Sequence, residues 1–148
     1  MADVLRSLGA TGQVRELPAP APTAAAAAAQ LGCDVGAIAN SLIFNADGEP
    51  LLILTSGAHR VDVVAIASRH GFASVKRADP KFVRAATGQV IGGVAPVGHA
   101  APIRTLIDVW LDKYDVVWAA GGHQHVVFPT SYSELLRLTS GEPANVAD

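Results

Sequence analysis

The segment that decides the fold is Ile38-Ala-Asn-Ser-Leu-Ile-Phe-Asn-Ala46, continued by Asp47-Gly-Glu-Pro50 and Leu51-Leu-Ile-Leu-Thr55. Its two apolar runs suit β-strands, and the Asp47-Gly48 pair between them is typical of a tight hairpin turn. We therefore expect a β-hairpin over residues 38–55. Similar apolar runs predict further strands at residues 103–108, 116–120 and 124–128.

Four helices are expected around these strands, because each candidate has a capping residue before it and a glycine close to its end. They begin after Thr23, Asp62, Asp79 and Ser131 and end near Gly32, Gly71, Gly88 and Gly141. Strand pairs interrupted by helices favour a mixed α+β domain over a regular strand–helix alternation.

The composition is that of one globular domain. Of the 148 residues 50% are hydrophobic and 16% are charged, which is enough apolar material for a core. No apolar run approaches the length of a membrane span, and the N-terminus lacks the pattern of a secretory signal, so we expect a cytoplasmic protein. The single Cys33 excludes an internal disulfide and a multi-thiolate zinc site.

Three parts of the chain are expected. Residues 1–22 read as an N-terminal helical appendage, with its helix within residues 1–17, followed by a proline-rich connector. Residues 23–141 form the main domain, and residues 142–148 are expected to be a frayed tail.

Positive charge is concentrated between residues 60 and 84. Six basic residues, Arg60, Arg69, Lys76, Arg77, Lys81 and Arg84, stand there against two acidic ones, Asp62 and Asp79. Such a cluster fits a face that binds phosphate, or simply a solvated surface.

The run from Gly88 to His99, Gly-Gln-Val-Ile-Gly-Gly-Val-Ala-Pro-Val-Gly-His, predicts a shaped loop. Closely spaced glycines let backbone amides approach an anion or a carbonyl, although a tight structural turn explains them equally well. The run is neither a Walker A loop nor a dinucleotide fingerprint.

Other catalytic arrangements find less support. His123 and His125 share one strand face, but no third metal ligand stands at a diagnostic spacing, so no metal site is expected. No serine elbow is present, and Cys33 follows a helix C-terminus, where the dipole disfavours a thiolate. Asp108 ends an apolar strand and is either an acid at a pocket edge or a cap.

Three segments in this order resemble the YbaK/prolyl-tRNA-synthetase-associated editing domain family. They are the glycine run from Gly88 to His99, Thr105-Leu-Ile-Asp108 and Tyr114-Asp-Val-Val-Trp-Ala-Ala-Gly-Gly122, and the resemblance extends from about residue 23 to residue 138. It implies a compact single α+β domain with a mixed, barrel-like β-sheet flanked by helices. The implied activity is that of a free-standing aminoacyl-tRNA deacylase, which hydrolyses the ester of a small mischarged amino acid on tRNA of the tRNA(Pro) type without a cofactor.

The resemblance and the basic cluster together assign the candidate site. The pocket and the oxyanion donors are expected at Gly92, Gly93, Val94, Pro96, Gly98, Asp108 and Asn40, with His99 and Ser56 at the rim. The tRNA-binding residues are expected to be Arg60, Lys76, Arg77, Lys81 and Arg84.

The chain departs from the family pattern in its first core strand, where Asn40 takes the position of a lysine. An amide forms weaker, uncharged hydrogen bonds than an ammonium group does. This favours, as the alternative function, a catalytically weakened module that binds the tRNA end. The expected partner is the acceptor end of aminoacyl-tRNA, and a synthetase partner and a homodimer remain open.

Overall fold

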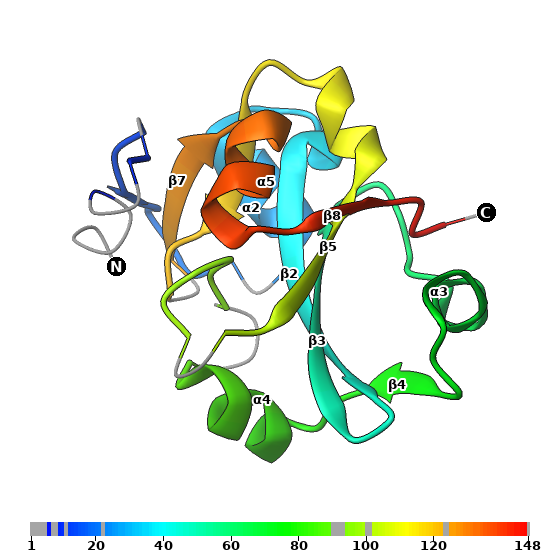
Figure 1. The fold of residues 1–148 in the computed structure, drawn as a ribbon. Helices are drawn as coiled ribbons and strands as arrows, with labels where there is room; N and C mark the ends of the chain where they lie inside the picture. The colour runs from blue at the N-terminus through cyan, green and yellow to red at the C-terminus, as the bar shows by residue number, and fades with distance from the viewer. Residues whose placement is uncertain are drawn as a thin grey trace.

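The computed structural model describes Arg6 and residues 9–10, 12–21, 23–89, 94–99, 102–122 and 125–147. The predictions for Gly92, Gly93 and His123 lie outside the described residues. One mixed sheet with helices on both sides forms the domain (Figure 1). The α+β class predicted from the sequence is therefore confirmed.

Eight strands of the described chain form this sheet, in the order β1-β7-β6-β2-β3-β5-β8, with β4 added beside β2. Their bounds are β1 Arg15–Glu16, β2 Ile38–Ala46, β3 Glu49–Ser56, β4 Val75–Arg77, β5 Arg104–Asp108, β6 Val117–Ala120, β7 Val126–Thr130 and β8 Glu142–Ala144. The pairs β2–β6, β3–β5 and β5–β8 are parallel, and the other pairs are antiparallel.

Strand β2 changes partner along its outer edge. Its inner edge pairs with β3 over its whole length, whereas its outer edge pairs with β6 at Ile38 and Ala39 and with β4 from Phe44 to Ala46. No described strand pairs with the outer edge at residues 40–43. The sheet is thus split beside the middle of β2.

The local signals in the sequence place the turns and helices. Asp47 and Gly48 both adopt positive φ, 54° and 90°, as the hairpin turn requires. The helices are α2 Ala24–Leu31, α3 Val63–His70, α4 Pro80–Thr87 and α5 Tyr132–Thr139, with short 3₁₀ turns η1 Val35–Ala37 and η2 Val109–Lys113. Thr23, Asp62, Asp79 and Ser131 cap the four α-helices through their side chains, which confirms those predictions.

One expectation needs correction, and one N-terminal strand was not predicted. Arg15 and Glu16 form β1, which pairs with β7. The frayed tail is wrong, because β8 pairs with β5 and Val146 is fully buried. The sheet is mixed, as expected, and it stays open rather than closing into a barrel, since β1 and β8 stand at opposite ends of the described strand order. Each of these features depends on pairing between distant segments.

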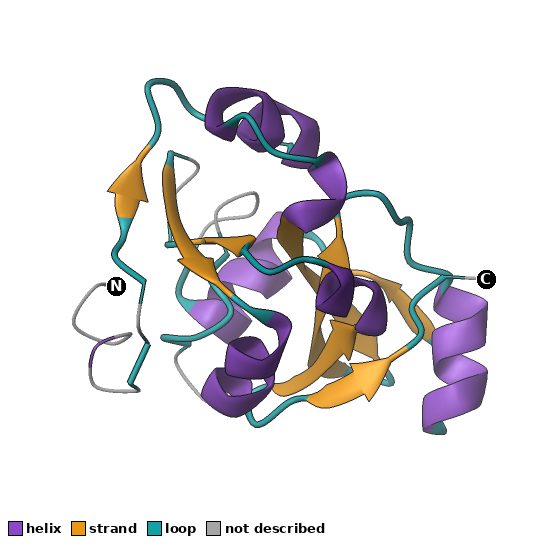
Figure 2. Ribbon diagram, turned by 90° about the horizontal axis from the view of Figure 1, so that it is seen from above, coloured by secondary structure: helices purple, strands orange, loops and turns teal. Residues whose placement is uncertain are grey.

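Apolar side chains fill both faces of the sheet. On one face, α5 contributes Leu135 and Leu138 to a cluster with Ile43 and Phe128; on the other, α3 contributes Ile66 to a cluster around Phe44. Seen from above, the helices lie outside the strands on both sides (Figure 2). None of the described helices is long and apolar enough to cross a bilayer.

The C-terminal residues should contribute measurably to stability. Replacing the fully buried Val146 by alanine removes packed methyl groups, and we expect the free energy of unfolding to fall by about 2 kcal/mol in denaturant titrations. Val64 is 76% exposed, so Val64→Ala is the matched control and should change stability by less than about 0.5 kcal/mol. Equal effects of the two substitutions would show that the tail is not part of the core.

Candidate functional site

A cleft of about 560 Å³ opens along the unpaired stretch of β2. Residues 40–44 of β2 form its floor. Its other walls come from Thr23, Ala24, His59, Arg60, Val61, Val63, Arg77, Ala78, Val83 and Val94. The break in strand pairing therefore makes the space. It also brings together segments far apart in the sequence.

Ser41 places polar groups at this edge. The carbonyl of Ile38 accepts a hydrogen bond from Gly57 on the β3 side, and the carbonyl of Ile43 accepts one from Ala78 on the outer side. Because backbone groups alternate along a strand, the N–H and C=O of Ser41 also face the outer side. Its hydroxyl is buried without a partner among the described residues. A buried unpaired hydroxyl is costly, and a ligand in the cleft would satisfy it.

A much smaller hollow, of about 40 Å³, adjoins the cleft, because the two share Thr23, Ala24, Asn40, Ser41 and Val94 in their walls. Alanines dominate the rest of its lining. Those alanines are Ala21, Ala27, Ala39, Ala119 and Ala120. The hollow can hold only a small group.

Asn40 lines both the cleft and the hollow, so the residue at the family's lysine position does belong to the candidate site. Val94, from the predicted glycine loop, also belongs to both linings. The structure thus brings together two of the residues predicted for the pocket.

Gln89 holds the described part of the glycine loop in place. Its Oε1 accepts a hydrogen bond from Ala95 N at 2.7 Å, and its Nε2 donates to the carbonyls of Val97 and Gly98 at 3.3 and 3.4 Å. Pro96 is buried within this loop, and Gly98 adopts a positive φ of 82°. Neither lines the cleft, so their contribution is to the shape of the loop that carries Val94.

Asp108 lies beneath the site rather than in it. The residue is 1% exposed. It lies in a row of polar residues that crosses three neighbouring strands, Asn40 of β2, Thr55 of β3 and Asp108 of β5. Asn40 pairs with Thr55, and Asp108 follows the Leu54–Ile107 pair by one residue. Its Oδ1 accepts from Trp110 N, so it does cap η2. Ser56, predicted at the rim, is fully buried, and its hydroxyl donates to the Gly36 carbonyl at 2.7 Å.

His59 is a cleft residue that the sequence analysis missed. It follows β3, and its Nδ1 lies 2.8 Å from Asp108 Oδ2. Both residues lie at or just beyond the carboxyl ends of neighbouring parallel strands, which meet at one edge of a sheet. A polar residue just after an apolar strand is the signal that could have suggested it, but the partnership of these two strands is not visible in the sequence.

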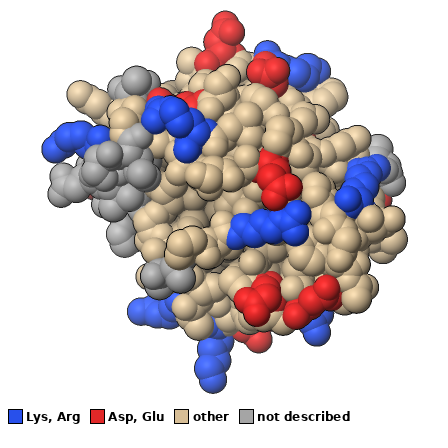
Figure 3. Space-filling view, in the orientation of Figure 1, with Lys and Arg blue, Asp and Glu red and all other residues tan. Residues whose placement is uncertain are grey.

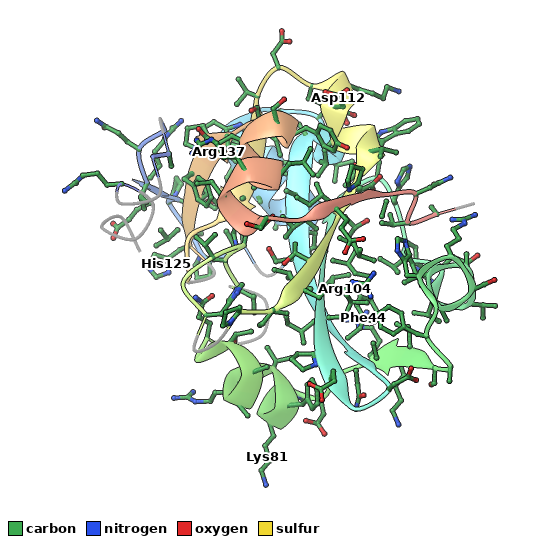
Figure 4. All side chains as sticks on the ribbon, in the orientation of Figure 1. Phe44, Lys81, Arg104, Asp112, His125 and Arg137 are labelled. Atoms are coloured by element: carbon green, nitrogen blue, oxygen red, sulfur yellow. The ribbon has the colours of Figure 1, made fainter. Side chains whose placement is uncertain are left out.

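The predicted tRNA-binding residues divide into two groups. Arg60 and Arg77 line the cleft, whereas Lys76, Lys81 and Arg84 are exposed residues outside its lining. Lys81 projects from α4 away from the molecule (Figure 4). Basic and acidic side chains are interspersed on the face shown in Figure 3. Only the two arginines therefore belong to the cleft itself.

Burial shifts the pKa values of His99 and Cys33. Burial lowers the pKa of His99 from 6.5, partly offset by its hydrogen bond to the Ala95 carbonyl, 2.7 Å from Nε2. Burial, and then the neighbouring Asp34 carboxylate, raise the pKa of Cys33, which favours the inert thiol. Within the described ranges, no group of three His, Cys, Asp or Glu residues is arranged to hold a metal ion.

Comparison with known proteins gives a family. Residues 18–138 match the sequence profile of the family described as "Aminoacyl-tRNA editing domain". The chain is 31% identical over 146 residues to the proline–tRNA ligase of Nitratidesulfovibrio vulgaris strain Hildenborough, with 90% of this chain aligned, but it spans only 25% of that ligase. It is 30% identical over 123 residues to the uncharacterized protein YwhH of Bacillus subtilis, covering 82% of this chain and 78% of YwhH.

A solved structure shows the same fold. The crystal structure of a candidate trans-editing enzyme for prolyl-tRNA synthetase superposes with a TM-score of 0.91 and 38% sequence identity, covering 99% of this chain and 93% of the other. A second crystal structure, of the hypothetical protein APE2540, superposes with a TM-score of 0.90 at 26% identity.

His99 should make the stability depend on pH. Because its pKa is lower in the folded protein than its ordinary value of 6.5, protonation favours unfolding, and stability falls as pH drops below that value. We expect the wild type to lose more free energy of unfolding than His99→Gln between about pH 7 and pH 5. Parallel losses in the two proteins, measured by urea titration, would contradict this.

Proposed function

Since the chain belongs to the aminoacyl-tRNA editing domain family, we propose that it is a free-standing aminoacyl-tRNA deacylase that hydrolyses the ester of a small, mischarged amino acid on tRNA. The observation that carries the proposal is the alanine-lined hollow of about 40 Å³ opening beside a cleft that bears two arginines. The hollow takes the amino-acid side chain, and the cleft takes the end of the tRNA.

The size of the hollow supports a small amino acid. Side chains larger than the space must displace the alanines of β2, β6 and α2, and packed interiors resist such expansion. Exclusion by volume rejects larger side chains well, but it separates near-isosteres by only about a hundredfold. The site is thus a sieve with an upper size limit.

The chemistry needs little beyond positioning. An aminoacyl ester is already activated, so the main requirements are a placed water and donors for the oxyanion of the tetrahedral intermediate. Among the described residues that line the cleft, the hydroxyl of Ser41 and the side-chain amide of Asn40 are proposed donors. Gly92 and Gly93 remain proposed donors of the same site.

The two cleft arginines suit the phosphates of a single-stranded acceptor end. Such ends are held largely through phosphate contacts by lysine and arginine. The similarity to proline–tRNA ligases supports tRNA of the tRNA(Pro) type as substrate, and prolyl-tRNA synthetase as a partner. This role would place the protein in the cytoplasm with the translation machinery.

Asn40 supports a second candidate function. It lines the site and has a neutral amide, so the chain could bind the charged tRNA end without hydrolysing it. A deacylase hydrolyses the ester, whereas a binding module leaves it intact, so the fate of the ester distinguishes the two functions.

The deciding experiment incubates the protein with a panel of tRNAs carrying small amino acids, matched and mismatched, and follows loss of the labelled ester against a buffer control. We expect one mismatched tRNA(Pro) species to be hydrolysed. If every ester persists while tRNA is retained on the protein, the binding module is correct and the deacylase is not.

Narrowing the hollow should reduce hydrolysis of the preferred ester. Ala120→Leu places a larger side chain into it, and we expect kcat/KM to fall by about tenfold or more. Ala25 is exposed on α2 and lines neither cavity, so Ala25→Leu is the matched control and should leave the rate unchanged. An Ala120→Leu protein with normal kcat/KM would mean that the hollow does not hold the amino acid.

Removing a cleft arginine should weaken tRNA binding. We expect Arg60→Ala and Arg77→Ala each to raise KM several-fold and to reduce the slope of log K against log salt by about one, which is the effect of one lost phosphate contact. Lys81→Ala, outside the cleft, is the control. If Lys81→Ala has the larger effect on KM, the tRNA binds elsewhere on the basic surface.

A further inference from the structure

The pair formed by Asp108 and His59 has the geometry of a histidine base oriented by a carboxylate. Imidazoles that move protons in enzymes are commonly fixed by a second group at the other ring nitrogen. Here His59, which follows β3 and lines the cleft, meets Asp108 at the end of β5.

The carboxylate of Asp108 is rigidly placed. Its Oδ1 accepts from Trp110 N at 3.0 Å, and its Oδ2 accepts from Ser56 N at 2.9 Å. With 1% of the residue exposed, solvent does not compete for it. The only side chain that brings a basic nitrogen to Oδ2 within the described chain is His59, at 2.8 Å.

This contact determines which nitrogen of His59 is available. A carboxylate at Nδ1 holds the proton on that nitrogen, so the neutral ring carries its lone pair on Nε2. No described residue forms a hydrogen bond with Nε2. The ring packs against Trp110 with 4.9 Å between centroids, its side chain is 21% exposed, and the residue lines the cleft.

We propose that His59 is a general base and acid of the reaction, with Asp108 as the residue that positions it. The proposal rests on the proposed function, because it requires an aminoacyl ester in the cleft. There Nε2 accepts the proton of the attacking water, while Asp108 keeps the ring in the required tautomer.

The step balances in protons and electrons. The water oxygen bonds to the ester carbon, the carbonyl π pair moves to oxygen, and one water proton passes to Nε2. When the tetrahedral intermediate collapses, the bond from carbon to the ribose oxygen breaks, and Nε2 returns the proton to that oxygen. The products are the free amino acid and uncharged tRNA, and the imidazole is neutral again.

The charged surroundings of the ring make a pH profile informative. Asp108 contacts the ring, and Arg60 and Arg77 line the same cleft. The Nζ of Lys113 lies 3.5 Å from the centre of the Trp110 ring that packs against His59, and Asp108 and Asp112 both act on Tyr132. Carboxylic acids generally titrate well below neutral pH, and lysine, arginine and tyrosine well above it. An acid limb that disappears with His59 therefore reports the imidazole.

The test uses the full chain and the mischarged tRNA that it hydrolyses. We expect His59→Gln to lower kcat by about a hundredfold or more, to change KM by less than about threefold and to abolish the acid limb of the rate profile. Added imidazole should partly restore the rate of His59→Ala. His70 lies on α3 outside the cleft, so His70→Gln is the matched control and should keep wild-type kcat and the acid limb.

Melting curves first establish that the variants are folded. The kinetic results then decide whether His59 takes part in the reaction. Folded His59→Gln with wild-type kcat, or His59→Ala that is slow but insensitive to imidazole, overturns the role of His59 and leaves the deacylase intact. A wild type that hydrolyses no ester in the panel overturns the deacylase and this proposal together.

Discussion

The split pairing of β2 is the constraint on which the rest of the structure depends. Along its inner edge this strand is bonded to β3 without interruption, and this pairing anchors β5 and β8 beyond it. Along its outer edge β6 and β4 pair only with the two ends. No described strand pairs with the middle, and the surrounding elements form the walls of the cleft there. The inner edge of β2 thus stabilises the sheet, and its outer edge borders the binding cleft.

The sequence predicts the elements well wherever their determinants are local. The caps at Thr23, Asp62, Asp79 and Ser131 and the turn at Asp47 and Gly48 are short-range features, and the structure confirms them. Strands β1 and β8 escaped prediction because they have two and three residues and little apolar pattern. They exist only because β7 and β5 offer them an edge.

The candidate site is less predictable than the fold for the same reason. Asn40 and Val94 could be placed in it through their family resemblance, and both line the cleft. His59 meets Asp108 across 49 positions of sequence, through a parallel pairing that no local pattern encodes. Burial of Ser56, and of Asp108 below the cleft rather than at its edge, likewise follows from packing. The residue types indicate which reactions are chemically feasible, but the pairing of the strands determines which residues lie together in the site.

The same topology has a consequence for how the chain acquires its structure. The β2–β3 and β6–β7 pairs join strands that are consecutive in the sequence, whereas β1–β7, β2–β6 and β3–β5 all close long loops. Such contacts form late, so folding is slow compared with helical proteins of this length. Until β6 and β4 dock, the hairpin exposes the entire outer edge of β2, with its apolar side chains, to other chains. The feature that creates the binding cleft is therefore also the point at which the nascent protein is most prone to aggregate.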